Sequence, residues 1–134
     1  SALHAVNIIP FKKEGIPWVR YEVHPLQNEG KTTIYCESPV LDKRKVKSSS
    51  GFGEIRYVIK TALAIAKSSW EIEITLTNRD SMGYRMLLGR QAMAGKILVD
   101  PEAAFQLGEL STHILKQHYK IIFQILNSQK KYIA

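Results

Sequence analysis

The sequence is poor in cysteine, in aspartate and in long apolar runs, and these shortages exclude several classes of protein. Cys36 is the single cysteine among 134 residues, so no disulfide framework holds the fold, and a cytoplasmic location is slightly favoured. The longest stretch without a formal charge has eleven residues, whereas a membrane-spanning helix needs about 20 apolar ones. We therefore expect a chain that does not cross a membrane.

Residues that hold metals or act as nucleophiles are also sparse. The four histidines and Cys36 form no Cys-x-x-Cys or His-Glu-x-x-His motif, and His113 and His118 lie five residues apart, on different parts of a helix surface. The chain has neither a Gly-x-Ser-x-Gly elbow nor a phosphate-binding loop. We predict no metal and no cofactor, and a structural or solvated role for each histidine.

Positive charge is present in excess, with 19 basic against 12 acidic residues. Part of this excess lies in residues 42–47, which hold one acidic residue and four basic ones, Lys43, Arg44, Lys45 and Lys47. Such a cluster attracts anions, although solvated loops and helix faces explain it equally well. Nucleic-acid binding would rest on charge alone, because no aromatic-studded binding motif accompanies it, and we do not predict it.

Hydrophobic residues alternate with a period of two through most of the chain, which predicts half-buried strands and an antiparallel β domain built from hairpins. The stretch 42–53 is polar and is expected to be a loop. Residues 90–95 favour one or two helical turns ended by a glycine. The expected strands cover residues 8–13, 18–24, 31–40, 54–66 and 70–77.

The final segment differs from the rest because its apolar residues recur at helical spacing from Leu110 to Leu126. We divide the chain into a β domain at 1–108 and an amphipathic helical extension at 109–134. The apolar face of this helix packs either on its own domain or on a second subunit. A helix lying on a membrane surface is less favoured, since the cationic face is sparse and lacks tryptophan.

Several segments, taken together and in order, resemble one family of enzymes. An apolar strand that runs into Gly89 and a short helix brings the backbone close to a neighbour at that glycine. The combination resembles the retropepsin-like aspartic peptidases often labelled putative ATP-dependent zinc proteases, over about residues 1–107. The matching segments are Ser-Ala-Leu-His-Ala at 1–5, Trp-Val-Arg at 18–20, His-Pro-Leu at 24–26, Ser-Ser-Ser-Gly at 48–51, Leu-Thr-Asn-Arg-Asp at 76–80, Met-Gly at 82–83, Met-Leu-Leu-Gly-Arg at 86–90 and Leu-Val-Asp-Pro at 98–101.

This resemblance implies a mainly β fold: an acid-protease barrel of antiparallel strands with one short helix, active as a homodimer that hydrolyses peptides. One aspartate from each subunit shares the site, and since two close carboxylates cannot both ionise, the pair holds one proton and activates water. Residues 48–56 match the flap that covers the substrate. The association of family members with ligases that add glutamates implies a glutamate-rich peptide substrate. The implied substrate-binding residues are Ser48, Ser49, Ser50, Gly51, Arg56, Leu88 and Gly89.

The chain departs from the family at its catalytic motif, Asp-Thr-Gly-Ala, which in the family comes just before the residues matching Ser1. Asp42, Asp80 and Asp100 are the only aspartates, and none stands in an Asp-Thr-Gly or Asp-Ser-Gly setting. We therefore expect no catalytic residue and no activity in the chain as given. The alternative is a non-catalytic module that binds peptides in the same groove. The spacing of histidine and cysteine gives no support to the zinc label.

Two further expectations concern the structure around the site. The residues 48–53 should be exposed and mobile as a flap would be, because small polar residues and glycines have little to bury. Arg90 should be partly buried as a structural support and paired with Asp80, since an unpaired buried guanidinium would be very costly.

Overall fold

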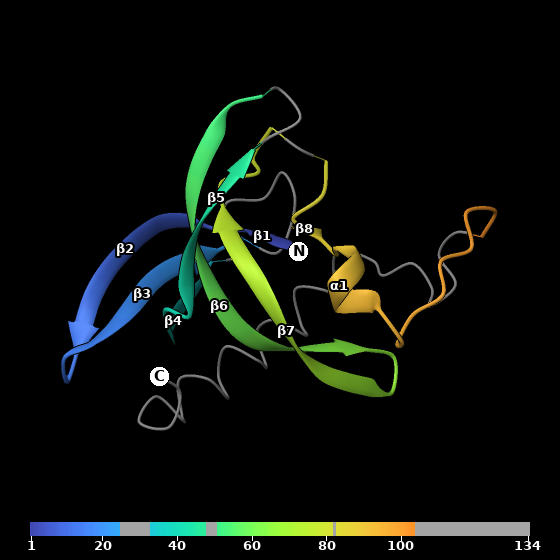
Figure 1. The fold of residues 1–134 in the computed structure, drawn as a ribbon, viewed down its shortest axis with the longest axis horizontal. Helices are drawn as coiled ribbons and strands as arrows, with labels where there is room; N and C mark the ends of the chain where they lie inside the picture. Colours follow the sequence, from blue (N-terminus) through green and yellow to red (C-terminus); the bar gives the residue numbers. More distant parts are fainter. Residues whose placement is uncertain (25–32, 48–50, 82, 104–134) are drawn as a thin grey trace.

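Two β-sheets and one short helix make up the fold (Figure 1), and the computed structural model describes residues 1–24, 33–47, 51–81 and 83–103. The larger sheet has the strand order β5-β6-β7-β1-β8, and the smaller sheet has the order β2-β3-β4. The elements are β1 (Ala2–His4), β2 (Val6–Lys13), β3 (Ile16–Val23), β4 (Ile34–Pro39), β5 (Asp42–Lys47), β6 (Gly53–Ile65), β7 (Ser68–Thr77), β8 (Met86–Leu87) and α1 (Arg90–Met93).

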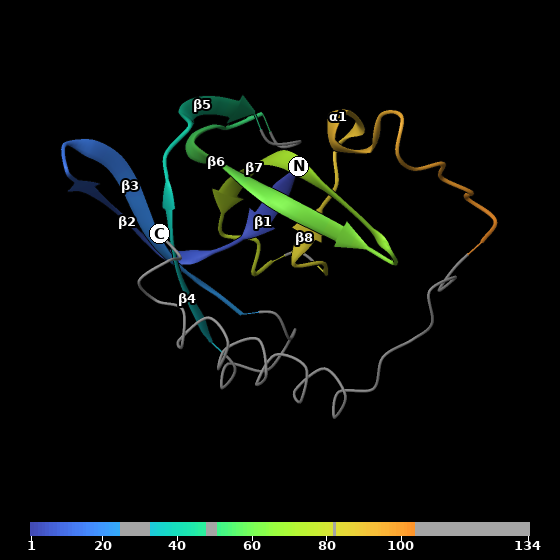
Figure 2. The same ribbon diagram turned by 90° about the horizontal axis from the view of Figure 1, so that it is seen from below.

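Hairpins generate most of the two sheets, as the alternating pattern predicts. The β2–β3 hairpin turns at Glu14 and Gly15, whose φ angles of 52° and 77° lie in the left-handed region that tight two-residue turns require. The β6–β7 hairpin is the longest pairing and runs from Ile65 opposite Ser68 to Val58 opposite Thr75. The two hairpins project in different directions from the centre of the molecule (Figures 1 and 2).

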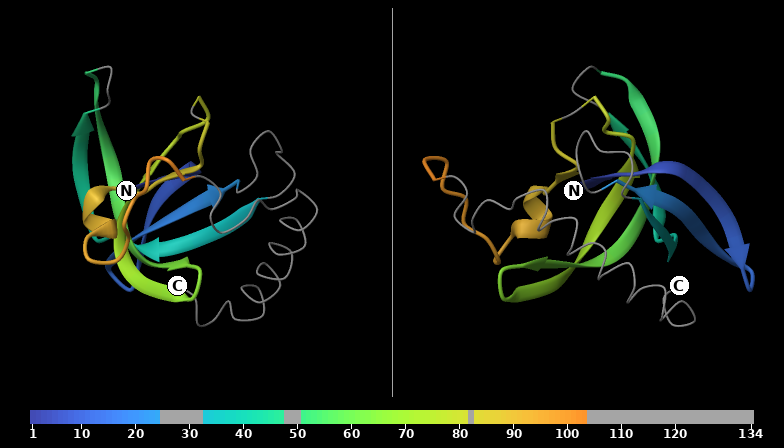
Figure 3. Two further views of the ribbon diagram at one scale, coloured as in Figure 1. Left: turned by 90° about the vertical axis from the view of Figure 1, so that its right-hand side faces the viewer. Right: turned by 180° about the vertical axis from the view of Figure 1, so that it is seen from behind.

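The first strand occupies an interior position in the larger sheet. β1 pairs in parallel with β7, where Ala2 lies opposite Thr75, and antiparallel with β8, where Ala2 lies opposite Leu87. Segments from both ends of the described chain therefore meet beside Ser1. The β5–β6 hairpin and residues 78–81 and 83–85 extend beyond Ser1 on the same side of the molecule (left view of Figure 3).

The core lies between the sheets and draws on the alternating residues of β7. Ile72, Ile74 and Leu76 are at most 4% exposed. Glu71 and Glu73, which alternate with these residues along the strand, are exposed. The cluster is completed by residues from β3, β6 and the β1–β2 junction, namely Ala5, Val19, Tyr21 and Ile59. Burying each large aliphatic side chain contributes about 1.5–3 kcal/mol, so this cluster dominates the stability of the fold.

The mainly β class and the short helix are confirmed, but two expectations need correction. The sheets do not close into a barrel, and the polar segment expected to be a loop contains the strand β5. This strand forms because β6 supplies a complete antiparallel partner from Asp42–Val58 to Lys47–Gly53. The helical extension at 109–134 lies outside the described residues, so the domain division stays a prediction. No helix among the described residues is long and apolar enough to span a membrane.

Candidate functional site

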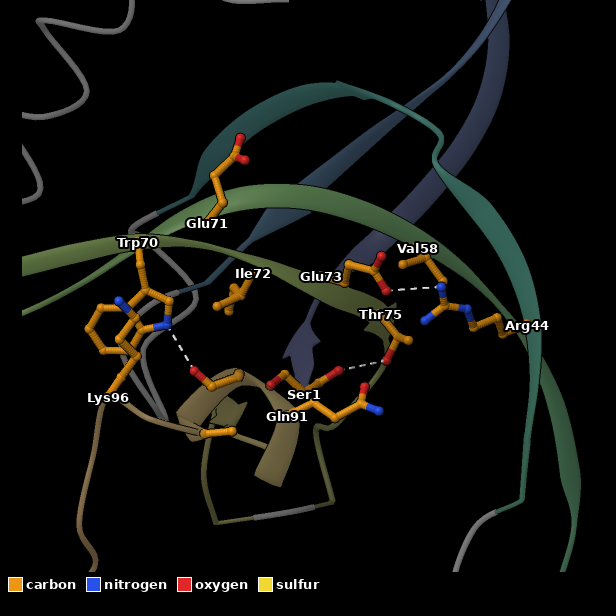
Figure 4. A pocket seen from close by; sticks show the side chains of 12 residues that line it. Ser1, Arg44, Val58, Trp70, Glu71, Ile72, Glu73, Thr75, Gln91 and Lys96 are labelled. Carbon is orange, nitrogen blue, oxygen red and sulfur yellow. Dashed lines mark hydrogen bonds and ion pairs between the residues drawn. The ribbon is translucent and has the colours of Figure 1, made fainter.

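A cavity of about 460 Å³ lies where the β5–β6 hairpin, β7, Ser1 and the α1 segment meet (Figure 4). Thr75 and Glu73 of β7 face it together with Val58 of β6, because residues opposite each other in a sheet share a face. The α1 segment closes the other side and is tied to β7 by Trp70, whose Nε1–H donates to the Ala92 carbonyl at 2.8 Å. The lining consists of Ser1, Arg44, Val58, Trp70, Glu71, Ile72, Glu73, Thr75, Gln91, Ala92, Ala94 and Lys96.

Ser1 forms part of the wall of this cavity and is fixed from two sides. Its carbonyl accepts the Thr75 backbone N–H at 3.1 Å and the Thr75 hydroxyl at 3.2 Å. Its own hydroxyl accepts the Gly89 N–H at 2.9 Å. A Cβ at Gly89 would lie 2.8 Å from the Ser1 nitrogen, which is closer than real Cβ contacts come. The close backbone approach expected at Gly89 is therefore confirmed.

Two of the charged side chains in the cavity wall, Arg44 and Glu73, pair with each other. Arg44 donates to Asp42 at 3.0 Å and lies 2.9 Å from Glu73, so it is shared between two carboxylates. Hydrogen bonds from the Arg44 guanidinium and the Lys43 N–H lower the pKa of Asp42. A carboxylate held ionised in this way is unsuited to sharing a proton with a second aspartate.

The basic cluster of β5 divides between the two faces of its hairpin. Arg44 faces the cavity, while Lys43 and Lys45 alternate to the other face, where their register partners are Tyr57 and Ile55. A Cβ at Gly53 would lie 2.7 Å from the Lys45 Cε, so the missing side chain makes room for that lysine. The cluster expected beside the flap therefore contributes only one of its four cations to the cavity wall.

A buried histidine anchors the segment that follows β7. His4 is fully buried, and its Nδ1 accepts the Arg79 N–H at 2.7 Å, which identifies the neutral tautomer with the proton on Nε2. The Nε2 lies 3.1 Å from an Asp80 oxygen but lacks hydrogen-bond geometry, so this contact is electrostatic. Burial lowers the pKa of His4, and the Asp80 charge opposes this only in part. The structural role agrees with one of the two roles expected for the histidines, but the sequence did not indicate the contact with Arg79.

The flap region is described only at its margins. Ser48, Ser49 and Ser50 lie outside the described residues, and Gly51 is exposed with a φ of 88°, which suits a glycine. Arg56 contacts Glu54 at 2.9 Å, and the same Glu54 carboxylate accepts the buried Thr77 hydroxyl at 3.0 Å. The Glu54–Thr77 hydrogen bond joins β6, next to the turn of the β5–β6 hairpin, to the end of β7.

The remaining predicted residues lie at the end of β8. Leu88 is half-buried and packs on the core, next to Gly89. Arg90 is exposed, and the expected pairing with Asp80 is wrong: Asp80 contacts Arg85 at 3.0 Å and His4 instead. The reason is that Arg85, which precedes β8, lies five residues from Asp80, whereas Arg90 begins α1 on the far side of β8.

The donors needed for a metal do not assemble in the described part of the chain. There, no three histidine, cysteine or carboxylate groups come close enough to hold an ion. Burial raises the pKa of the Cys36 thiol to about 11, which keeps it protonated and a poor ligand at neutral pH.

Comparisons with known proteins agree with the segment resemblance. The family model described as "Retropepsin-like aspartic endopeptidase RimB" matches residues 1–108. A crystal structure of a Legionella pneumophila protein of unknown function (DUF785) shares 30% identity with a TM-score of 0.61, covering 78% of this chain and 74% of that one.

Longer relatives carry a different name. Proteins named "Probable alpha-L-glutamate ligase" from Shewanella pealeana and Parasynechococcus marenigrum are each 55% identical, over 90% and 89% of this chain. The chain spans 26% of the length of each of these two relatives. Their name describes bond formation rather than peptide hydrolysis.

Proposed function

This chain belongs to the RimB-like family of retropepsin-like aspartic endopeptidases, and from that premise we propose that it forms the substrate-binding body of a peptidase for glutamate-rich peptides. The catalytic aspartate comes from the segment that precedes Ser1 in the parent protein, and a second copy of the domain supplies the other aspartate. The chain as given then binds peptide without hydrolysing it.

The observation that carries this proposal is the position of Ser1. Its nitrogen lies against Gly89 in the wall of the cavity, so a residue joined to that nitrogen enters beside the cavity. The family motif Asp-Thr-Gly-Ala stands just upstream of this point in the sequence pattern. The cavity would accept an extended peptide, because the exposed β5–β6 hairpin borders it as a flap borders a retropepsin groove.

Two features support a glutamate-rich substrate. The β5 strand beside the cavity carries Lys43, Arg44, Lys45 and Lys47. Only Arg44 lines the cavity, but the summed potential of the four cations attracts anions beyond direct contact. The longer relatives are named for adding glutamate, and a domain next to such an activity would meet glutamate-rich products.

Hydrolysis of a labelled glutamate-rich peptide tests the proposal. We expect cleavage by the parent protein, none by the parent with Asp-Thr-Gly changed to Asn-Thr-Gly, and none by the 134-residue chain. Cleavage by this chain at the parent's rate would contradict the assignment of the aspartate. The absence of any Asp-Thr-Gly or Asp-Ser-Gly upstream of Ser1 would remove the peptidase function.

A second function, non-catalytic peptide binding, is favoured by the pairing of two of the three described aspartates. Asp42 is held by Arg44 and Asp80 by Arg85, so neither is available as a catalytic acid. Peptide binding by the parent without any cleavage, unchanged by the Asn-Thr-Gly variant, would identify this function instead.

A further inference from the structure

A second hollow lies on the other face of the β5–β6 hairpin, between it and the β2–β3 hairpin. Its volume is about 540 Å³, and its lining is mainly apolar, with Phe11, Pro17, Val40, Leu41 and Tyr57 among the contributors. Leu41, one of these lining residues, is 47% exposed. We call this hollow the hairpin groove.

Unpaired cations surround the hairpin groove. Lys12 and Lys43 line it, and Lys13 lies beside it with its Nζ 4.6 Å from the centre of the Trp18 ring. Among the described residues none of these three lysines has a carboxylate partner. The one acid in the lining, Asp42, is already bound by Arg44 and the Lys43 N–H. The groove therefore has an apolar floor and a rim of lysines that have no carboxylate partner among the described residues.

The aromatic rings of the groove are not open for stacking. Lys13 covers Trp18, which is 8% exposed, and the Arg20 guanidinium lies 5.3 Å from the centre of the Phe11 ring. Lys43 lies 5.4 Å from the centre of the Tyr57 ring. Binding of single-stranded nucleic acid depends on free ring faces that accept bases, so these contacts argue against it.

We propose that the hairpin groove docks an acidic peptide segment carrying one large apolar side chain between carboxylates. The apolar residue fills the floor around Leu41, and the flanking carboxylates meet Lys12 and Lys43. This site is distinct from the cavity at Ser1, because Lys43 and Arg44 are neighbours in a strand and face opposite sides of it. The complementary charges give orientation, and the apolar contact gives affinity.

Fluorescence anisotropy with the full 134-residue chain tests this docking site. The probe is a labelled seven-residue peptide with a central leucine flanked on each side by three glutamates. The variants are Lys43→Glu, Lys12→Glu and Leu41→Asn, and the matched control is Lys67→Glu, an exposed lysine in the β6–β7 turn. Circular dichroism verifies that each variant keeps its strand content.

We expect Lys43→Glu and Lys12→Glu each to weaken binding about fivefold at low salt, because each replaces an attractive exposed ion pair with a repulsive one. Leu41→Asn weakens it by a similar factor, while Lys67→Glu changes it less than twofold. Equal affinity for a probe whose leucine is replaced by alanine would overturn the proposal in favour of unspecific charge attraction. A loss of affinity in the Lys67→Glu control as large as in Lys43→Glu would do the same. Tighter binding of a ten-nucleotide uridine oligomer, lost in the same variants, would overturn it in favour of nucleic acid.

Discussion

Substituting Gly89 by alanine should destabilise the protein by loosening the strand that begins at Ser1. The φ and ψ of Gly89 are −85° and 163°, values that alanine adopts freely, so the effect would not come from backbone strain. The added Cβ would lie 2.8 Å from the Ser1 nitrogen, while ordinary contacts begin near 3.4 Å. Either β1 or the β8–α1 junction has to move by about 0.6 Å or more to restore such a contact.

That displacement acts on a group of short hydrogen bonds. The bond from Gly89 to Ser1 measures 2.9 Å and lengthens if the two backbones separate. The bond from Thr75 to Ser1, 3.1 Å long on the other side of β1, is disturbed if Ser1 shifts toward β7. Forcing a methyl group into a packed site costs about 1–3 kcal/mol, and we expect about 2 kcal/mol here. For a chain of this size that corresponds to a fall in Tm of roughly 8 °C.

Urea and thermal unfolding of Gly89→Ala measure this loss. The matched control is Gly83→Ala, since a Cβ at Gly83 would meet nothing within 4 Å and its φ is ordinary. We expect the control to change the unfolding free energy by less than about 0.5 kcal/mol. Equal stability of the two variants would refute the argument that the chain is packed against Gly89.

Three further predictions concern buried polar groups. Burial lowers the pKa of His4 in the folded state below 6.5, so its contribution to the unfolding free energy should be constant above about pH 6.5 and fall as the pH drops through the folded pKa. Urea titrations at several pH values measure this dependence. A His4→Asn variant with the same dependence of stability on pH would contradict it. Thr77→Val removes the donor to Glu54 and should cost about 1 kcal/mol in urea unfolding, whereas exposed Thr61→Val should cost nearly nothing; equal losses would count against that hydrogen bond. The Cys36 thiol, with its pKa raised to about 11, should react with a disulfide reagent far more slowly in the folded than in the urea-unfolded chain at pH 8, and equal rates would show it accessible.

The strands that the sequence predicts well are those with one buried and one solvated face. β7 is the clearest case, because Ile72, Ile74 and Leu76 alternate with polar residues along its length. The same alternation does not predict β5, because five of its six residues are charged and only Val46 is apolar. Its strand conformation comes from pairing with β6, a long-range contact that no local periodicity reveals.

The sequence predicts a residue of the candidate site only where its neighbours in the chain explain why that residue type is needed. Gly89 is found because an apolar strand ending in glycine indicates a close backbone approach. The parallel pairing of β1 with β7, which sets Thr75 beside Ser1, joins residues more than seventy positions apart. The error at Arg90 has the same origin: sequence proximity suggested Asp80 as its partner, but β8 separates them, and Arg85 takes that place.

Successive side chains of β5 point to opposite faces of the hairpin, so the basic residues of this strand form two surfaces and not one. In the cavity, Arg44 is shared by Asp42 and Glu73, so its charge is offset by carboxylates of the same wall. On the other face, Lys43 stands above an apolar floor without a carboxylate partner among the described residues. A field from the excess positive charge can therefore draw an acidic peptide to either face. The hairpin groove offers Lys12 and Lys43, which have no carboxylate partner among the described residues, whereas in the wall of the cavity Arg44 is paired and Lys96 is not. Under the proposed function, recognition at the cavity would depend on shape, on backbone hydrogen bonds to an extended peptide and on Lys96, because Arg44 is already shared by two carboxylates.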